Sequence, residues 1–294
     1  MPPLHDTDHN RQKKAAVIND FTSFGRCSLA VTIPILSALK VQCCSVPTAI
    51  FTNHTGYPSF AWTDYTDHLD DYIREWQKLH LRFDAIATGF LGSHRQVDFV
   101  QRFLTTFRDE RTIVVVDPVM GDYGRLYATY DATLAESMRA FLDVADILTP
   151  NLTEACVLAN RPYDPAITDA ELLELCQQLT SRHATKIVVS GIARGSELVN
   201  FVFERDCSPQ LFAEPKIGND RSGSGDVFAS VILADAVNGV PFAESVQRAS
   251  NFVAKAVART VELGIPEQDG LAIEEVLTEL ISCSITNRTS DREP

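Results

Sequence analysis

The sequence predicts a single α/β domain with a central, mainly parallel sheet flanked by helices on both faces. Apolar β-type runs alternate with amphipathic helical stretches along most of the 294 residues, and several runs are nearly continuous in β-branched residues, as in strands buried on both faces. No Pro/Gly-rich linker and no fixed-period repeat divides the chain. We therefore expect one domain over residues 14–280, between polar tails at 1–13 and 281–294.

The predicted strands are short apolar runs, and the predicted helices are longer amphipathic stretches that lie between and after them. In chain order the strands are KAAVIND (14–20), VQCCSVPTAIF (41–51), FDAIATGF (83–90), RTIVVVD (111–117), ADILTP (145–150), TKIVVSGI (185–192) and LVNFVFE (198–204). In the same order the helices cover 27–40, 65–79, 93–110, 130–145, 151–160, 169–183, 226–239 and 242–264. Because strand, helix and strand follow one another this often, most neighbouring strands should be parallel and covered by helices.

Composition narrows the possible functions. The net charge is −13 and the isoelectric point about 4.9, so the chain lacks the basic face with which a protein binds nucleic acid. The first residues are polar, without the apolar core of a signal peptide, and no window is apolar enough to cross a bilayer. We therefore expect a soluble, cytoplasmic protein that binds neither nucleic acid nor membrane. Seven scattered cysteines without a CxxC pair indicate neither a disulfide framework nor a zinc site.

Ligands of an open α/β sheet bind beyond the carboxyl ends of the strands, where loops lead into helices. The residues that break the apolar pattern at those ends are therefore the candidates for a site. They are Asp20, 53–57 (NHTGY), 88–90, 117–122 (DPVMGD), 149–155 (TPNLTEA), 190–192 and 223–226 (GSGD).

The GSGD motif places Gly223, Ser224 and Gly225 directly before a predicted helix, with Asp226 at its entry. Glycines let a ligand approach the backbone closely, and the free N–H groups of a first helical turn attract anions. An acid at that point would repel phosphate unless it faces a second substrate. Asp226 is therefore predicted to be the general base that takes a proton from an attacking hydroxyl. The alternative is that Ser224 or Asp226 only caps the helix.

Two further motifs carry acids at strand ends. DPVMGD has Asp117 at a strand end and Asp122 beyond a glycine turn. TPNLTEA has Asn151 and Glu154 three residues apart, on the first turn of a helix. Oxygen ligands of this kind suit a water-coordinated Mg²⁺ with its polyphosphate, and a cation would relieve the repulsion between carboxylates at successive strand ends. The alternative for TPNLTEA is a capping box, with Thr149 or Asn151 as the cap and Glu154 completing it.

The motifs in this order identify a family. The P-loop motif GxxxxGK[ST], a GxGxxG turn and the protein-kinase motif set do not occur in the sequence. Asp20 with FTSFGRCS, then NHTGY, DPVMGD followed by GRLY, TPNLTEA and GSGDVFA instead resemble the ribokinase-like superfamily and, in this combination, the pyridoxal kinases. The likeness runs from about residue 15 to about residue 265. It implies a usually dimeric enzyme that transfers the γ-phosphoryl group of ATP to the 5′-hydroxyl of pyridoxal, pyridoxine or pyridoxamine, with Mg²⁺ and often an activating K⁺.

Site roles follow from the resemblance position by position. It implies that Asp226 is the general base and that Gly223, Ser224 and Gly225 form the anion hole for the γ-phosphate. The positions matched on the nucleotide side are Asp117, Asp122, Tyr127, Thr149, Asn151 and Ser190, and those matched for Mg²⁺ are Asp117 and Glu154. The positions matched around the pyridine ring are Asp20, Thr55 and Phe90. Asp20 stands where many relatives carry serine and Phe90 where some carry tyrosine, so the polar contacts to the ring differ.

Three alternatives stay open. A hydroxymethylpyrimidine kinase of thiamine synthesis shares the fold, the turn and the phosphate chemistry, and Asp20 could pair with an aminopyrimidine or with a protonated pyridine nitrogen. A sugar or nucleoside kinase of the superfamily would commonly carry a β-type lid after the first strand, where residues 20–55 look helical. A vitamin B6 carrier without catalysis would gain nothing from keeping Asp226 and both acidic motifs.

Overall fold

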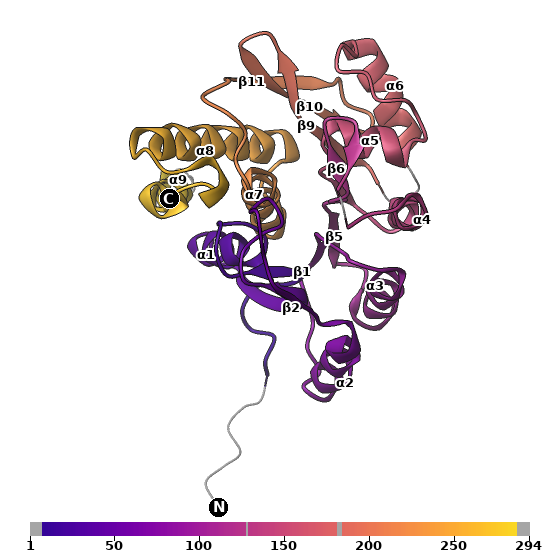
Figure 1. The fold of residues 1–294 in the computed structure, drawn as a ribbon. Coiled ribbons are helices and arrows are strands. Elements are labelled where there is room, and N and C mark those ends of the chain that lie inside the picture. Colours follow the sequence, from indigo (N-terminus) through magenta and orange to yellow (C-terminus); the bar gives the residue numbers. More distant parts are fainter. Residues whose placement is uncertain (1–7, 128, 181–183, 287–294) are drawn as a thin grey trace, which may run out of the picture.

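One nine-stranded sheet forms the centre of the computed structural model, which describes residues 8–127, 129–180 and 184–286 (Figure 1). Its strands are β1 (Lys14–Thr22), β2 (Gln42–Phe51), β3 (Trp62–Asp64), β4 (Ala85–Thr88), β5 (Ile113–Val116), β8 (Ile147–Leu148), β9 (Lys186–Arg194), β10 (Glu197–Glu204) and β11 (Gln210–Pro215). They lie in the order β11-β10-β9-β8-β5-β4-β1-β2-β3. The six strands from β2 to β9 in that order are parallel, and β3, β10 and β11 pair antiparallel at the two edges.

Helices cover both faces of the sheet, as Figure 1 shows. The helices of one face are α1 (Leu29–Ala38), α7 (Ser224–Asn238), α8 (Phe242–Glu262) and α9 (Leu277–Thr286). Those of the other face are α2 (Leu69–Lys78), α3 (His94–Phe107), α4 (Ala132–Ser137), α5 (Leu152–Leu158) and α6 (Asp169–Leu179). In the part of the chain that the structure describes, none of the helices has the length and apolar content needed to span a bilayer.

All seven predicted strands occur, and the differences lie in short or exposed elements. Three observed features are not among the elements predicted from the sequence. They are edge strand β3, edge strand β11, and the hairpin of β6 (Gly121–Asp122) and β7 (Arg125–Leu126). The two edge strands are largely exposed and the hairpin strands have two residues each, so none carries a run of buried apolar residues.

Two predicted helical segments also differ from what is observed. The predicted helix 130–145 is divided into α4 and a 3₁₀ helix, η2 (Met138–Asp143). Helix α9 was not predicted and runs to Thr286, into the predicted tail 281–294; residues 287–294 and 1–7 lie outside the described residues. The predicted helix 169–183 ends at Leu179 as α6, and its last three positions are likewise outside the described part.

The alternation of the parallel strands determines which polar residues face α7. In β1, Ala15 and Val17 pack in the core beneath α1, α7 and α8, while Ile18 packs on the opposite face. Asn19 continues the first series, and the pairing of β1 with β2 becomes irregular directly after it. In β5, Val115 belongs to the same core as Ala15, so the next residue in phase, Asp117, also lies at the α7 side. Because parallel strands end at one edge, these polar side chains meet there.

Candidate active site

The turn before α7 combines a position that requires glycine with a position that is open. Gly223 has a φ of 79°, and a Cβ there would lie 2.0 Å from the carbonyl oxygen of Arg26. Gly225 lies in the first turn, and apart from its chain neighbours and the backbone of its own helix no atom stands within 4 Å of the place that its Cβ would take. Gly223 is the N-cap residue and has no side chain with which to cap the helix. The first-turn N–H groups and the space above Gly225 can therefore receive an anion.

Asp226 lies in this first turn and is held by residues outside its own helix. Its Oδ1 accepts a hydrogen bond from Nδ2 of Asn19 at 3.2 Å, and its carboxylate also accepts the backbone N–H of Ser28. Burial raises the pKa of the Asp226 carboxyl to about 6; these two hydrogen bonds oppose the rise and the charge of Asp20 adds to it. The alternative in which Ser224 or Asp226 caps α7 is therefore wrong, because Gly223 occupies the cap position.

Asp20 is almost fully buried and lies close to Asp226. Its Oδ1 accepts the hydroxyl of Ser28 at 2.6 Å, and its Oδ2 accepts the hydroxyl of Thr22 at 2.8 Å. Burial raises the pKa of the Asp20 carboxyl above its ordinary value, although both hydroxyls act in the opposite direction. Ser28 thus contacts two carboxylates, Asp20 through its hydroxyl and Asp226 through its backbone N–H.

A second pair of carboxylates lies at the ends of β5 and β8. Asp117 accepts the hydroxyl of Thr149 on its Oδ1 at 3.2 Å. Burial raises the pKa of Asp117, and the negative charge of Asp226 adds to this rise. Burial also raises the pKa of Glu154 well above its ordinary value, with the charge of Asp117 as the next cause. Because each ionised carboxylate disfavours the other, a cation bound between them would favour the charged form of both.

Glu154 also has a structural role. Its Oε1 accepts the N–H of Met120 at 3.1 Å and its Oε2 the N–H of Asn151 at 2.9 Å. The side chain of Asn151 in turn accepts the N–H of Glu154 at 3.0 Å, so the capping box predicted as the alternative for TPNLTEA is confirmed, with Asn151 as the cap of α5.

The described residues do not form a complete protein cage for a metal ion. Within residues 8–127, 129–180 and 184–286, no group of three or more His, Cys, Asp and Glu side chains could hold a metal ion. Mg²⁺ is commonly bound by one or two carboxylates, water and the phosphates of a substrate. Asp117 fits this pattern, because its carboxylate accepts a single described hydrogen bond, on Oδ1, and Glu154 stands next to it.

The other candidates for the nucleotide side surround the same strand ends. Asn151 donates through Nδ2 to a backbone carbonyl of β6 at 2.8 Å and forms a parallel bridge with Ser190. Asp122 belongs to β6, and Tyr127 follows β7 with its N–H on the carbonyl of Met120, the residue whose own N–H contacts Glu154. The structure therefore brings the sequence-predicted acids, Asn151 and Ser190 to one edge of the sheet.

Of the candidates for the ring side, Phe90 is linked to Asp226 through Asn19, whereas Thr55 lies on a separate loop. Phe90 donates its N–H to Oδ1 of Asn19 at 2.8 Å, and its half-buried ring lies 6.2 Å from that of Phe51 and 6.0 Å from that of Tyr130, centroid to centroid. Thr55 is exposed on the NHTGY loop, and no described hydrogen bond joins it to Asp226.

The NHTGY loop is fastened to the segment that follows α8. His54 Nδ1 accepts the N–H of Gly56 at 3.0 Å, so its Nε2 carries the proton that is donated to the carbonyl of Gln268 at 2.6 Å. Tyr57 donates its hydroxyl to Asp269 at 2.7 Å. Two segments far apart in the sequence are therefore joined to each other.

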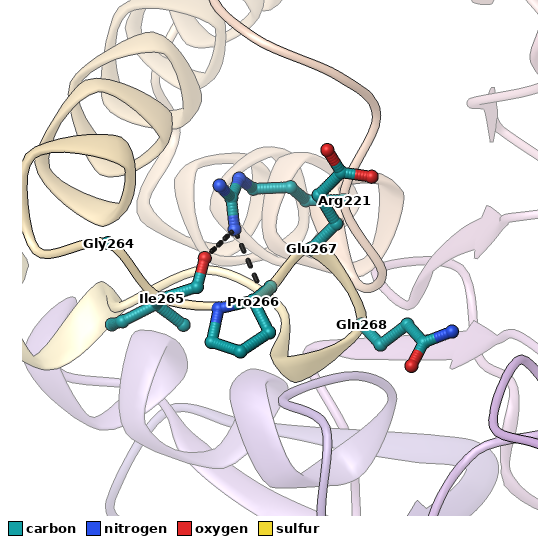
Figure 2. Close-up of a pocket in the computed structure, with 6 residues that line it drawn as sticks. All are labelled: Arg221, Gly264, Ile265, Pro266, Glu267 and Gln268. Carbon is teal, nitrogen blue, oxygen red and sulfur yellow. Dashed lines mark hydrogen bonds between the residues drawn. The ribbon is translucent and has the colours of Figure 1, made fainter.

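A hollow of about 460 Å³ adjoins the segment that precedes GSGD. It is lined by Arg221 and residues 264–268, and Figure 2 shows the Arg221 guanidinium directed toward the carbonyl groups of Ile265 and Pro266, at 2.9 and 3.2 Å. Asn219 additionally donates to the carboxylate of Glu267. The approach to the GSGD turn is thus fixed against the end of α8, and Asp226 is not among the residues that line this hollow.

The sequence analysis missed the two hydrogen-bond donors to Asp226, Asn19 and Ser28. Neither residue is an acid, and both lie near Asp20, whose carboxylate is the more obvious candidate in this part of the sequence. The available signal was the phase of Asn19, a polar residue in series with Ala15 and Val17 on the face that α7 covers.

The sequence is similar to known small-molecule kinases. A family model described as phosphomethylpyrimidine kinase matches residues 33–270. The chain is 25% identical over 258 residues to the pyridoxine/pyridoxal/pyridoxamine kinase of Bordetella pertussis, covering 83% of this chain and 88% of the relative.

Solved structures extend the likeness to the fold. The structure of a putative phosphomethylpyrimidine kinase from Bacteroides thetaiotaomicron is 36% identical in sequence, with a TM-score of 0.90, and the match covers 92% of this chain and 95% of the other. A second crystal form of that protein, with pyridoxal, is 35% identical with a TM-score of 0.87, and the match covers 92% of this chain and 96% of the other. Pyridoxal kinase from Lactobacillus plantarum is 26% identical with a TM-score of 0.85 over 92% and 98%. The predicted α/β fold, with its mainly parallel sheet, is confirmed.

Proposed function

The chain belongs to the phosphomethylpyrimidine kinase family, and from this premise we propose that it transfers the γ-phosphoryl group of ATP to the 5′-hydroxyl of pyridoxal, pyridoxine or pyridoxamine. The observation that carries the proposal is the start of α7. There a helix N-terminus without a capping side chain stands next to Asp226, a carboxylate whose described donors are an amide and a backbone N–H rather than a cation. That pairing suits the acceptance of a phosphoryl group and of a proton at neighbouring points.

The chemistry follows from those two parts. Asp226 accepts the proton of the substrate hydroxyl as the hydroxyl oxygen bonds to the γ-phosphorus, and the bond from that phosphorus to the bridging oxygen of ADP breaks. The amides of the Gly223–Gly225 turn receive the phosphoryl oxygens in the open space over Gly225. A pKa of about 6 leaves Asp226 mostly ionised at neutral pH while keeping it basic enough to take the proton.

The acidic edge is assigned to the nucleotide. Mg²⁺, when bound, would neutralise charge on the β- and γ-phosphates, and Asp117 and Glu154 are the residues proposed to hold it through oxygen atoms and water. The proposed nucleotide contacts are Asp122, Tyr127, Thr149, Asn151 and Ser190, which surround these acids. An activating K⁺ is also proposed, from the family resemblance alone.

The substrate ring is assigned to the space between β1, the NHTGY loop and the end of β4. Phe90 would provide an aromatic wall, Thr55 a polar contact from the loop, and Asp20 a carboxyl group whose oxygens each already accept one hydroxyl. The pyridoxal in the Bacteroides relative supports a pyridine ring as the occupant.

A hydroxymethylpyrimidine kinase is the second candidate, because the matching family model carries that kind of description. Turnover of pyridoxal, pyridoxine, pyridoxamine and hydroxymethylpyrimidine should be compared side by side with Mg-ATP, with ADP release coupled to a spectroscopic readout. We expect the highest kcat/KM with a vitamin B6 vitamer. Exclusive use of the pyrimidine would overturn the assignment, and turnover of ribose or adenosine alone would place the chain among sugar or nucleoside kinases.

Assembly and location complete the proposal. The family resemblance supports a homodimer that works in the cytoplasm, with no nucleic acid or membrane as partner. Sedimentation equilibrium of the purified chain measures the oligomeric state, and a monomer at micromolar concentration would contradict the proposed homodimer. Fractionation of the source cells tests the proposed cytoplasmic location.

A further inference from the structure

Asn19 is a buried polar residue that the proposed reaction leaves without a role. It ends the apolar series of β1 and is only 5% exposed. A buried carboxamide lowers stability unless its donors and acceptors are paired, so its partners indicate why it is there.

The partners fix the orientation of the carboxamide. Oδ1 of Asn19 accepts two backbone N–H groups, that of Asp20 at 2.9 Å and that of Phe90 at 2.8 Å. Nδ2 donates to Oδ1 of Asp226 at 3.2 Å. If the carboxamide were turned end for end, its NH₂ would face two N–H donors and its oxygen would face a carboxylate, so only one orientation satisfies all three contacts.

The end of β4 approaches this side chain so closely that glycine is required there. A Cβ on Gly89, at the end of β4, would lie 2.5 Å from both Cγ and Nδ2 of Asn19. Gly89 is also tied to β1 by its N–H on the carbonyl of Ile18 at 2.9 Å. The carboxamide is therefore wedged between the ends of β1 and β4 and points across the gap to α7.

We propose that Asn19 is a positioning residue of the phosphoryl transfer. It holds the Asp226 carboxylate in the orientation that takes the substrate proton. Through the N–H groups of Asp20 and Phe90 it also fixes the position of the ring-binding residues relative to Asp226. This inference rests on the proposed function of Asp226. A carboxylate on a first helical turn has several staggered rotamers, and the fixed donor selects one of them. The same donor favours the ionised base.

A purely structural role is the competing explanation, since the same carboxamide ties β1 to β4. Asn19→Asp separates the two. It keeps the size of the side chain and an acceptor for both backbone N–H groups, but it removes the donor to Asp226 and places a like charge there. Thr48→Val is the matched control, because Thr48 Oγ1 donates to the carbonyl of Phe90 at 3.0 Å and fastens the same strand end without a described contact to the base.

The experiment measures kcat and KM for pyridoxal with Mg-ATP from pH 5 to pH 9, with melting temperatures for each variant. For Asn19→Asp we expect kcat to fall about 10- to 100-fold, KM to change less than about threefold, and the acid limb of the kcat profile to move to higher pH. Thr48→Val should leave kcat and the acid limb unchanged. Asn19→Ser, which removes the donor geometry without adding charge, should lower kcat in the same range and serves if the aspartate variant does not fold.

Two results would overturn the inference. One is an Asn19→Asp or Asn19→Ser enzyme that is folded and has the kcat and pH profile of the wild type. The other is a Thr48→Val enzyme that loses as much kcat, with the same shift of the acid limb. Wild-type protein that phosphorylates no B6 vitamer would instead contradict the proposed function itself, so the two failures are distinguishable.

Discussion

Helix α7 carries two aspartates, one half-buried and one buried, that differ in their partners. Asp226 lies in its first turn and Asp235 near its last, and burial raises the pKa of each carboxyl to about 6. Asp235 forms an ion pair with Nη1 of Arg248 at 2.8 Å and accepts the hydroxyl of Ser245 at 3.2 Å. The same Arg248 also donates to the carbonyl of Leu280, so this pair joins α7, α8 and α9.

Asp226 has the opposite surroundings. Its described donors are neutral, and the charges that act on its neighbourhood, those of Asp20 and Asp117, have its own sign. A raised pKa is therefore shared by a structural and a candidate catalytic aspartate, and the counter-ion tells them apart. The predictions below test this difference, beginning with the largest expected effect.

Asp226→Asn should lower kcat by about 10²- to 10⁴-fold, because the amide cannot accept the substrate proton. Binding of pyridoxal and of Mg-ATP should change little, since the side chain keeps its shape. Steady-state kinetics and isothermal titration measure the two quantities, with Asp235→Asn as the control on the same helix. A variant with unchanged turnover would remove Asp226 from the role of base.

Asp235→Ala should lower the free energy of unfolding by about 3 kcal/mol, near the lower end for a broken buried pair because Arg248 is 18% exposed. The kcat of the folded fraction should stay near the wild-type value. Urea denaturation gives the stability. The double variant Asp235→Leu with Arg248→Met should recover most of the loss, because no unpaired charge then remains buried. Equal losses in the single and double variants would contradict the ion-pair explanation.

The pH dependence of stability should differ between wild type and Asp226→Asn. A carboxyl group whose pKa is higher in the folded protein binds protons more tightly there, so its contribution to stability is present at low pH and is lost as pH rises. For Asp226 the window runs from its ordinary value of 3.8 to about 6. The variant should match the wild type near pH 4 and exceed it by about 1–3 kcal/mol above pH 6. Urea denaturation at both pH values measures this, and a difference independent of pH would contradict it.

Gly225→Ala should give the smallest effect on structure and a moderate one on catalysis. A methyl group there meets no protein atom, so stability should stay equal or rise by up to about 1 kcal/mol through helix propensity. The methyl would occupy the space proposed for the phosphoryl oxygens, and kcat/KM should fall about tenfold, a change of about 1.4 kcal/mol. Gly223→Ala is the contrasting variant, because its methyl group would clash with the backbone of Arg26 and should lower the free energy of unfolding. Unchanged kinetics in Gly225→Ala would place the phosphate elsewhere.

The strands and the acidic edge were predictable because their signals are local. Runs of β-branched residues predict buried strands, and Asp117 directly follows such a run, while Asn151 and Glu154 belong to the motif that follows the next predicted strand. The hydrogen bonds to Asp226 are not local: Asn19 and Asp226 are 207 residues apart in the chain. The dual use of Glu154, as a cap and as a neighbour of Asp117, also depends on which side of α5 faces β5. The site was thus predictable in its carboxylates and less so in the neutral groups that orient them.

Ser28 links two tasks that a protein engineer would wish to change separately. Its hydroxyl steadies Asp20 while its backbone N–H steadies Asp226. Because Asp20 is the proposed ring contact and Asp226 the proposed base, redesigning Asp20 for a different ring should also disturb the support of Asp226. Selection for a new substrate in this scaffold should consequently return paired changes at positions 20 and 28 more often than single ones.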